Sequence, residues 1–216
     1  AKAGVEVGTE IIWERAASKS KPKAVFINKT DDPDADCEKV IKQLSEMFGR
    51  SICPLMIPAK GSQGAAGDLV NILEMKRYSY DKNGNRSEAD ADPDEYSDYR
   101  EKFYEAVAAV DDELTMKYLE GEEITKEEAV EALQSGIISG EITPVYCGSA
   151  MKLWGVRAFL DGVVDSFPYP DRKKNEKIVK NGEVVDMPIQ REGPPSVMVF
   201  KTIIDQFGRT SYFKVM

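Results

Sequence analysis

Short apolar runs of strand length, set between longer segments with helical periodicity, are the feature that most constrains this fold. Residues 24–27 (Ala-Val-Phe-Ile) have no polar position, which is typical of a strand buried on both faces. Residues 143–147 form a second strand-like run. Apolar residues recur at helical spacing at 7–19, at 37–48, and from Val156 onward in a helix predicted to end before Pro168. The alternation of helix and buried strand predicts an α/β fold with a parallel sheet.

Between Pro58 and Gly140 the sequence has a different character. This segment begins with a glycine-rich loop at 61–67, continues with a predicted hairpin at 68–80 and becomes strongly acidic at 88–101, where it leads into a predicted helix. Thr125 and Glu128 have the spacing of a capping box in front of a further helix. These patterns indicate an inserted α+β subdomain with a small core of its own.

Residues 51–57 are predicted to form a strand that is irregular or lies at an edge, because Pro54 cannot donate a ladder hydrogen bond.

The chain divides into five predicted parts. The parts are the first piece of the α/β domain (1–58), the inserted subdomain (59–141), the last strand and helix of the α/β domain (142–170), a polar linker with a hairpin turn at Asn181 and Gly182 (171–194), and the first strands of a truncated β domain (195–216).

Composition and charge exclude several classes of function. With 42% apolar and 31% charged residues, the chain has the balance of a globular protein. Its 29 Lys and Arg against 38 Asp and Glu give a net charge of −9, which disfavours binding to naked nucleic-acid backbone. The lack of histidine removes the commonest general base and the usual zinc ligand.

Cysteine usage and hydropathy predict a cytoplasmic protein. Cys37, Cys53 and Cys147 are odd in number and lack metal-ligand spacing, so we expect reduced thiols and no disulfide-linked partner. No run of about 18 apolar residues occurs, so we expect no membrane partner. Because the chain opens on Ala1 and stops at Met216 inside an apolar, β-like run, we expect it to be a piece of a longer protein.

The sharpest chemical feature is Asn28-Lys29-Thr30-Asp31, directly after the first apolar run. Open α/β sheets place their ligands at the carboxyl ends of the strands. The Asp31 carboxylate presents two acceptors side by side, which match the N1 and N2 donors of guanine and do not match adenine. Lys29 can lay its aliphatic stem on the base, and Asn28 can brace a neighbouring loop. On their own, four such residues more often form a solvated polar turn.

A second loop supports the first. Gly148-Ser149-Ala150 follows the other buried strand and precedes a helix, so its backbone N–H groups can point at a base carbonyl such as guanine O6. Taken alone, this loop would be an ordinary helix entry with Ser149 as its cap. Two such loops at the ends of parallel strands converge on one place, and together they predict a guanine site.

The two loops resemble the base-recognition motifs of translational GTPases. Their surroundings are similar to the elongation factor G family, and the resemblance covers nearly the whole chain. The similar segments are Ala3-Gly4-Val5-Glu6-Val7, Thr9-Glu10, Gly67-Asp68-Leu69-Val70, residues 155–165, residues 195–201 and Gly208-Arg209. Ribosome-protecting tetracycline-resistance GTPases are the second choice, because they usually carry a shorter insertion.

The resemblance implies the later half of a Ras-like GTPase domain of the P-loop NTPase type, with an insertion and the start of a β-barrel domain. It assigns guanine-nucleotide binding to Asn28, Lys29, Asp31, Ser149 and Ala150, with GTP and GDP as substrate and product. No Gly-x-x-x-x-Gly-Lys-Ser/Thr phosphate loop occurs, and no Asp-x-x-Gly switch is followed by the histidine that the family carries there. We therefore expect Mg²⁺ binding in the full-length protein only, no catalytic residue in this chain, and no GTP hydrolysis by the chain alone.

In the full-length protein, the resemblance implies translocation on the ribosome driven by GTP hydrolysis. The acidic insertion is then expected to face a basic ribosomal protein near the factor-binding site. The alternative outside the GTPases is a non-enzymatic interaction module with vestigial nucleotide loops. The acidic residues at 88–101 lack the glycine and the closing glutamate of a calcium loop, so we expect no metal site there.

Overall fold

A computed structural model describes residues 1–61, 67–81, 83–169, 175–189 and 197–215. The chain forms two compact units, Ala1–Phe167 and Pro168–Met216, and each is described by itself. The site predicted from the sequence lies entirely within the first unit. None of the helices in the described ranges is both long and apolar enough to cross a lipid bilayer.

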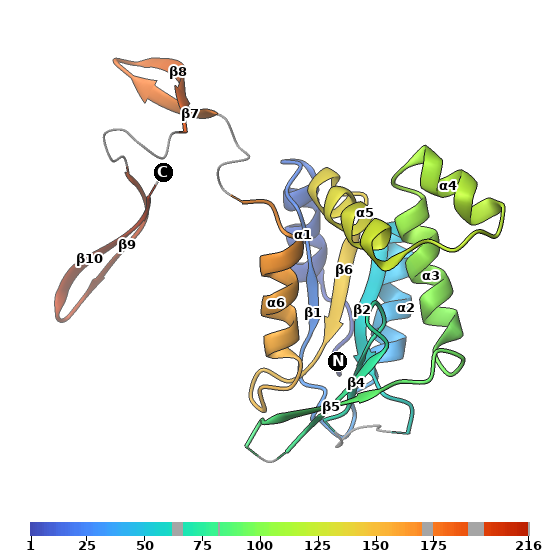
Figure 1. The fold of residues 1–216 in the computed structure, drawn as a ribbon. Coiled ribbons are helices and arrows are strands. Elements are labelled where there is room, and N and C mark those ends of the chain that lie inside the picture. The colour runs from blue at the N-terminus through green and yellow to red at the C-terminus, as the bar shows by residue number, and fades with distance from the viewer. Residues whose placement is uncertain (62–66, 82, 170–174, 190–196, 216) are drawn as a thin grey trace. The chain divides into compact units, whose positions relative to one another are not determined.

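The first unit is built on a six-stranded sheet with strand order β1-β6-β2-β3-β4-β5 (Figure 1). β1, β6 and β2 are parallel, and β3, β4 and β5 continue the sheet as antiparallel neighbours. The strands are β1 (Val25–Ile27), β2 (Ile52–Pro58), β3 (Leu69–Asn71), β4 (Lys76–Tyr80), β5 (Arg86–Asp90) and β6 (Thr143–Cys147). The predicted α/β fold with parallel strands is therefore confirmed.

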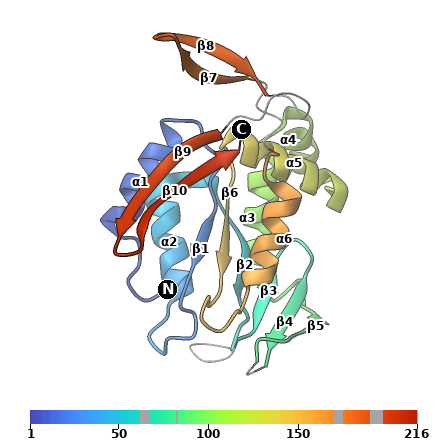
Figure 2. The same ribbon diagram turned by 90° about the vertical axis from the view of Figure 1, so that its left-hand side faces the viewer.

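Helices cover both faces of this sheet. α6 lies on one face, whereas α2 and α3 lie on the other, where both contact β2 (Figures 1 and 2). The helices are α1 (Val7–Ala17), α2 (Cys37–Phe48), α3 (Ser97–Ala108), α4 (Asp112–Leu119), α5 (Lys126–Ser139) and α6 (Val156–Ser166), with a 3₁₀ turn at Gly49–Ser51. The carboxyl ends of β1 and β6 point to the bottom of Figure 1, where the β4–β5 hairpin also lies.

α2 shows how local sequence sets the elements that flank the first loop. The Asp36 side chain accepts a hydrogen bond from the Lys39 amide and begins the helix, and Gly49, with φ +76°, ends it. Trp13 of α1 stacks on Phe48 at the end of α2, with 4.0 Å between ring centroids. Trp13 is therefore a packing residue that joins α1 to α2.

The buried residues of the first unit form one continuous core. Phe103, Val107 and Leu133 from the segment between β2 and β6 belong to the same cluster as Leu44 and Val145. The expectation of a separate small core in the insertion is wrong, because β3 pairs directly with β2 and α3 packs on the same strand. The boundaries drawn for the insertion, 59–141, stay a prediction.

β2 confirms one of the two alternatives that Pro54 leaves open. Pro54 predicts an edge or irregular strand, but β2 lies between β6 and β3. The strand is irregular, since its register with β6 shifts between Pro54 and Met56. The missing N–H of Pro54 is accommodated by this local irregularity, which lets a proline occupy an interior strand.

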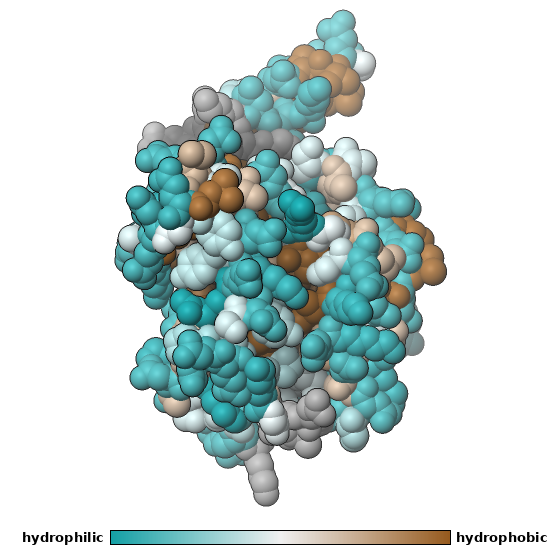
Figure 3. Space-filling model, turned by 90° about the vertical axis from the view of Figure 1, so that its right-hand side faces the viewer, coloured by the Kyte–Doolittle hydropathy of each residue, from teal (hydrophilic) through white to brown (hydrophobic). Residues whose placement is uncertain are grey.

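The acidic stretch contains more structure than the predicted helix. Its first part is β5, which pairs with β4, and α3 begins only at Ser97. The predicted hairpin at 68–80 is confirmed as β3 and β4. Figure 3 shows the side of the molecule that carries α3 and α4 in Figure 1 as a mostly hydrophilic surface.

The second unit contains two hairpins. β7 (Asn175–Lys180) pairs with β8 (Glu183–Pro188) through Asn181 and Gly182, whose φ angles of +55° and +85° suit a tight hairpin turn. The predicted linker is therefore partly a β-hairpin. β9 (Val197–Asp205) pairs with β10 (Gly208–Val215), which confirms the two strands predicted near the end of the chain.

Several sequence-based assignments fall on residues that the structure does not describe. They are the centre of the glycine-rich loop at 62–66, the outer parts of the predicted linker at 171–174 and 190–194, the first residues of the predicted β domain at 195–196, and Met216.

The predicted capping box is present at the start of α5. The Thr125 hydroxyl accepts from the Glu128 amide, and the Glu128 carboxylate accepts from the Thr125 amide at 2.8 Å. Lys117 of α4 donates to the same carboxylate at 2.8 Å. The hydrogen bond from Lys117, followed by those from Thr125, lowers the pKa of Glu128 from 4.5 to about 2.

This low pKa predicts a pH dependence of stability. The Glu128 carboxylate stabilises the fold fully above pH 4.5, and that contribution is lost as the pH falls to about 2. Replacing Glu128 with Gln should therefore reduce the loss of unfolding free energy across this pH interval, measured by urea denaturation. Glu127→Gln, an exposed change in the same turn, should keep the wild-type slope. Equal slopes in all three proteins would contradict the role assigned to Glu128.

Candidate guanine-nucleotide site

The carboxyl ends of β1 and β6 form one edge of the parallel sheet, and the two predicted loops leave from it. We call residues 28–31 the first loop and residues 148–155 the second loop. Backbone hydrogen bonds continue the strand pairing into them, since Gly148 N–H donates to Ile27 at 3.0 Å and Thr30 N–H donates to Gly148 at 3.1 Å. The structure therefore brings the two loops together, as the sequence predicts.

Asn28 ties the loops to each other. Its side-chain Oδ1 accepts from the Ala150 amide at 3.0 Å and from the Lys29 amide at 2.7 Å. Ala150 lies 122 residues away along the chain, so this contact depends on the tertiary fold. The expectation that Asn28 braces the neighbouring loop is confirmed by this geometry.

Lys29 has an unusual backbone conformation. Its φ is +66°, in the left-handed region that residues with a Cβ seldom occupy. Backbone strain of this kind is often found at binding loops that the surrounding fold holds in place. The Lys29 side chain is exposed, so its stem is available to a planar ligand.

Asp31 is half-buried, and its carboxylate makes no hydrogen bond or ion pair with any described residue. The next carboxylates along the loop differ, because Lys2 pairs with Asp32 at 3.5 Å and with Asp34 at 2.7 Å. Of these three acidic residues, Asp31 is the one whose acceptors are uncommitted to a cation within the described chain. That state suits the acceptor pair predicted for guanine.

Ser149 and Ala150 occupy different environments. Ser149 is 1% exposed and its amide donates to the Trp154 carbonyl, whereas Ala150 is exposed. The Ser149 hydroxyl accepts from the Lys152 amide at 3.2 Å. Of the two amides, only that of Ala150 is therefore placed to donate to a base carbonyl. On doing so, it would share its proton with Asn28 Oδ1 or release that hydrogen bond.

Gly148 and the second loop fit closely against the strands. A Cβ on Gly148 would lie 2.3 Å from the Trp154 carbonyl oxygen and 2.7 Å from the Phe26 ring, so no side chain fits there. Cys147, the last residue of β6, is buried, and its hydrogen bond with Cys37 and its burial raise the pKa of its thiol. Cys147 is therefore an inert thiol, and all three cysteines are free.

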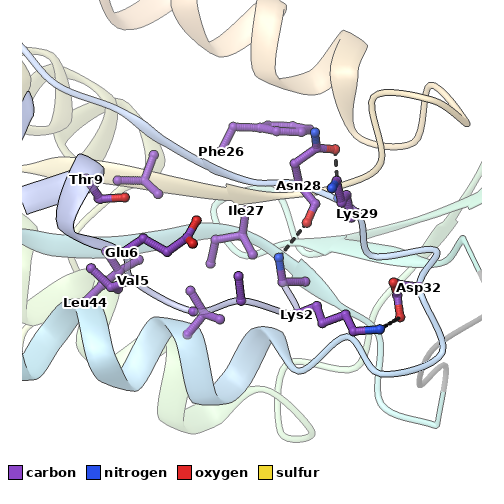
Figure 4. Close-up of a pocket in the computed structure, with 15 residues that line it drawn as sticks. Lys2, Val5, Glu6, Thr9, Phe26, Ile27, Asn28, Lys29, Asp32 and Leu44 are labelled. Carbon is purple, nitrogen blue, oxygen red and sulfur yellow. Dashed lines mark hydrogen bonds and ion pairs between the residues drawn. The ribbon is translucent and has the colours of Figure 1, made fainter.

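A pocket of about 390 Å³ lies beside the first loop, on the outer side of β1 (Figure 4). Residues from the first six positions, α1, β1 and α2 line it, and it shares Asn28 and Lys29 with the candidate site. The lining does not include Asp31, Ser149 or Ala150. It is therefore a different cavity from the place where the two loops converge.

Within the described ranges, no group of three or more His, Cys, Asp or Glu side chains could hold a metal ion. The glycine-rich loop that begins at Gly61 lacks the lysine and the adjoining hydroxyl of a phosphate loop, and its residues 62–66 lie outside the described chain. Among the described residues where the two loops meet, the Lys29 side chain and Ala150 are exposed and the Asp31 carboxylate is half-buried.

Comparison with known families decides the assignment. Residues 1–169 match the family model described as the elongation factor Tu GTP binding domain. The chain belongs to this family of translational GTPases. The Ras-like fold and the translational-GTPase resemblance inferred from the sequence are thereby confirmed.

Two relatives resemble this translational GTPase over its whole length. An elongation factor G-like protein of Thermotoga maritima is 35% identical over 218 residues, which cover 100% of this chain and 32% of that protein. A crystal structure of a Thermus thermophilus protein matches 100% of this chain with a TM-score of 0.78 and 30% identity, over 30% of that chain. The present chain spans about a third of the length of these relatives.

The closed shape of the second loop of this GTPase domain was not predicted from the sequence. Ser149 and Trp154 exchange two backbone hydrogen bonds of 3.0 Å, which close the loop on itself, and Leu153 within it has φ +60°. The flanking glycines, Gly148 and Gly155, were the available signal for a tightly closed loop. Trp154 is half-buried and packs against the core.

The Asn28 bridge gives a direct prediction for this GTPase domain. Asn28→Ala removes the acceptor of the Ala150 amide, so hydrogen exchange at Ala150 should accelerate about tenfold, the value of one hydrogen bond of about 1.4 kcal/mol. Asn28→Asp keeps an acceptor at the same place and should retain most of the protection. Exchange that is equally slow in wild type and Asn28→Ala, measured by NMR, would show that the bridge does not hold the second loop.

Proposed function

We propose that this chain is the guanine-recognition part of a ribosome-associated elongation GTPase similar to elongation factor G. In the full-length protein, GTP would be the substrate, GDP the product, and hydrolysis would drive translocation. The observation that carries the proposal is the convergence of the two loops at one sheet edge, tied by the 3.0 Å hydrogen bond between Ala150 and Asn28. The elongation factor G-like relative supports the ribosomal role.

Asp31 is proposed to select guanine. Its half-buried carboxylate has no cationic partner among the described residues, so both oxygens can accept from N1 and N2 of the base. Adenine would present an acceptor to this charge and leave it unpaired, which costs about 1–3 kcal/mol or more. Lys29 would contact the base plane through its stem, as expected from its exposed position in the left-handed region.

The second loop is proposed to recognise guanine O6. The exposed Ala150 amide would donate to it, sharing its proton with Asn28 or releasing that bond. Ser149 contributes by closing the loop, because its amide and carbonyl both bond to Trp154. In this proposal Asn28 and Ser149 position the loops, and Asp31, Lys29 and Ala150 touch the base.

Hydrolysis would require residues outside this chain. Phosphoryl transfer depends on holding the phosphates and Mg²⁺, and the sequence has no motif for either. We therefore propose that the 216-residue chain alone does not turn over GTP. Mg²⁺ would be bound in the full-length protein only.

The Asp31 proposal is tested by changing the base that the site accepts. In the full-length protein, Asp31→Asn should weaken GTP binding about 10- to 100-fold, the value of charged hydrogen bonds of about 1.5–3 kcal/mol. The new amide can donate to O2 of xanthine, so binding of xanthosine triphosphate should strengthen. Calorimetry with both nucleotides measures the switch.

Asp34→Asn is the matched control, because it removes an exposed carboxylate from the next turn that pairs with Lys2. It should leave the preference between GTP and xanthosine triphosphate unchanged. If Asp31→Asn bound GTP as tightly as wild type, the proposal that Asp31 selects guanine would be wrong.

The acidic side of the insertion is proposed to meet a basic ribosomal protein. Asp94, Glu95 and Asp98 are exposed, and none of them forms an ion pair with a described residue. Such a surface repels RNA phosphate and attracts a basic protein. Its hydrophilic character is visible in Figure 3.

Charge reversal tests this surface. Changing Asp94, Glu95 and Asp98 to Lys in the full-length protein should slow ribosome-stimulated GTP turnover about tenfold at low salt, with little change in intrinsic nucleotide affinity. The difference should shrink as salt is raised.

The control carries the same change in net charge at exposed positions of α1 and α2, namely Glu14, Glu38 and Glu46 to Lys. If both triple variants respond equally to the ribosome, the acidic surface acts only through net charge.

A further inference from the structure

The second loop is held from outside by the segment between β2 and β6. Four residues of that segment lie against its last four positions, and each contact comes from a different place on β3, β4 or the turns beside them. Gly67, Leu69, Tyr80 and Gly84 make these contacts with residues 152–155. We call this group of four the brace.

The turn between β4 and β5 supplies the outermost contact. A Cβ on Gly84 would lie 3.2 Å from the Lys152 carbonyl oxygen and 3.4 Å from Leu153 Cβ. Gly84 also has φ +79°, which disfavours any other residue. The turn therefore lies directly on Leu153, the residue that holds a left-handed conformation with φ +60°. A leucine in that conformation persists only where its surroundings hold it.

The inner contacts are closer than the outermost one. A Cβ on Gly67 would lie 2.6 Å from the Trp154 ring, and a Cβ on Gly155 would lie 2.8 Å from Leu69 Cδ1. Leu69 is 2% exposed, so this side of the loop is packed into the core. The Tyr80 hydroxyl is buried without a hydrogen-bond partner in the described chain, and the Gly155 amide is near enough to oppose the rise in its pKa that burial causes.

The β4–β5 turn, which carries Gly84, is held by hydrogen bonds to Asp81. The Asp81 carboxylate accepts from the Asn83 amide at 2.8 Å, from the Asn85 amide at 2.9 Å and from the Asn85 side chain at 2.8 Å. The Gly84 amide donates to the Asp81 carbonyl at 3.0 Å. A turn cross-linked in this way resists displacement and can press on a strained loop.

We propose that the brace positions the second loop for guanine binding, and that the β4–β5 turn at Gly84 slows nucleotide release by holding Leu153 in its left-handed conformation. A contact of Gly84 with Leu153 can affect the residue proposed to bind the base, because Leu153 lies three residues from Ala150. Both residues belong to a loop closed by the Ser149–Trp154 hydrogen bonds. The residues of the brace touch no base and act through the loop. This inference rests on the proposed guanine site.

The test compares two glycines of the same conformation. Gly84→Ala places a Cβ against Lys152 and Leu153, whereas Gly121 has φ +74° and nothing within 4 Å of its Cβ position. Both alanine variants carry similar backbone strain and should lose similar thermal stability. In the full-length protein, release of fluorescent GDP should be about five to ten times faster in Gly84→Ala, and within about twofold of wild type in Gly121→Ala.

A second variant separates positioning from stability. Leu153→Gly removes the side chain under the turn and also removes the strain of φ +60°, so it should release GDP faster without lowering the melting temperature. If Gly84→Ala does not fold, Leu153→Gly still tests the contact between the turn and the second loop. Equal release rates in Gly84→Ala and Gly121→Ala, or wild-type release in Leu153→Gly, would overturn the proposal.

The proposal about the brace and the proposal about the guanine site can be refuted separately. If wild type binds no guanine nucleotide, the proposed function is wrong, while hydrogen exchange still tests the brace. The amides of Ser149, Lys152 and Trp154, which bond within the loop, should then exchange faster in Gly84→Ala than in Gly121→Ala. Equal exchange in those two variants would overturn the brace itself.

Discussion

Parallel pairing of β1 with β6 is the interaction on which the rest of the structure depends. It joins strands more than a hundred residues apart in sequence, with Val25 opposite Val145 and Ile27 opposite Cys147. Because parallel strands end at the same edge, both loops leave the sheet side by side. The hydrogen bond from Gly148 to Ile27 extends this pairing beyond β6 and sets where the second loop begins.

The segment inserted between β2 and β6 is integrated into the same framework. β3 adds to β2, α3 packs on β2, and α5 leads directly into β6, so one core serves the entire first unit. This arrangement explains why a segment that looks independent in composition can lie against the second loop. It also makes the position of that loop depend on residues far from it in sequence, such as Leu69 and Gly84.

The candidate site combines committed and uncommitted polar groups. Asn28 and Ser149 form hydrogen bonds that hold the loops, whereas the Asp31 carboxylate has no partner among the described residues. Such a division is expected of a binding site, because positioning groups must be satisfied internally and recognition groups must be available to the ligand. Lys29 and Leu153 add left-handed conformations, one in each loop.

The sequence by itself determined the buried strands of the α/β part with their flanking helices, the two loops and the residues proposed to meet guanine, because periodicity, caps and turn residues act over a few positions. It also predicted the capping box at Thr125 and the hairpin at Asn181-Gly182. Only the tertiary structure decided that β2 is an interior strand, that the insertion shares one core, and that Asn28 bonds to Ala150. Those features depend on contacts between residues distant along the chain, which local patterns do not encode.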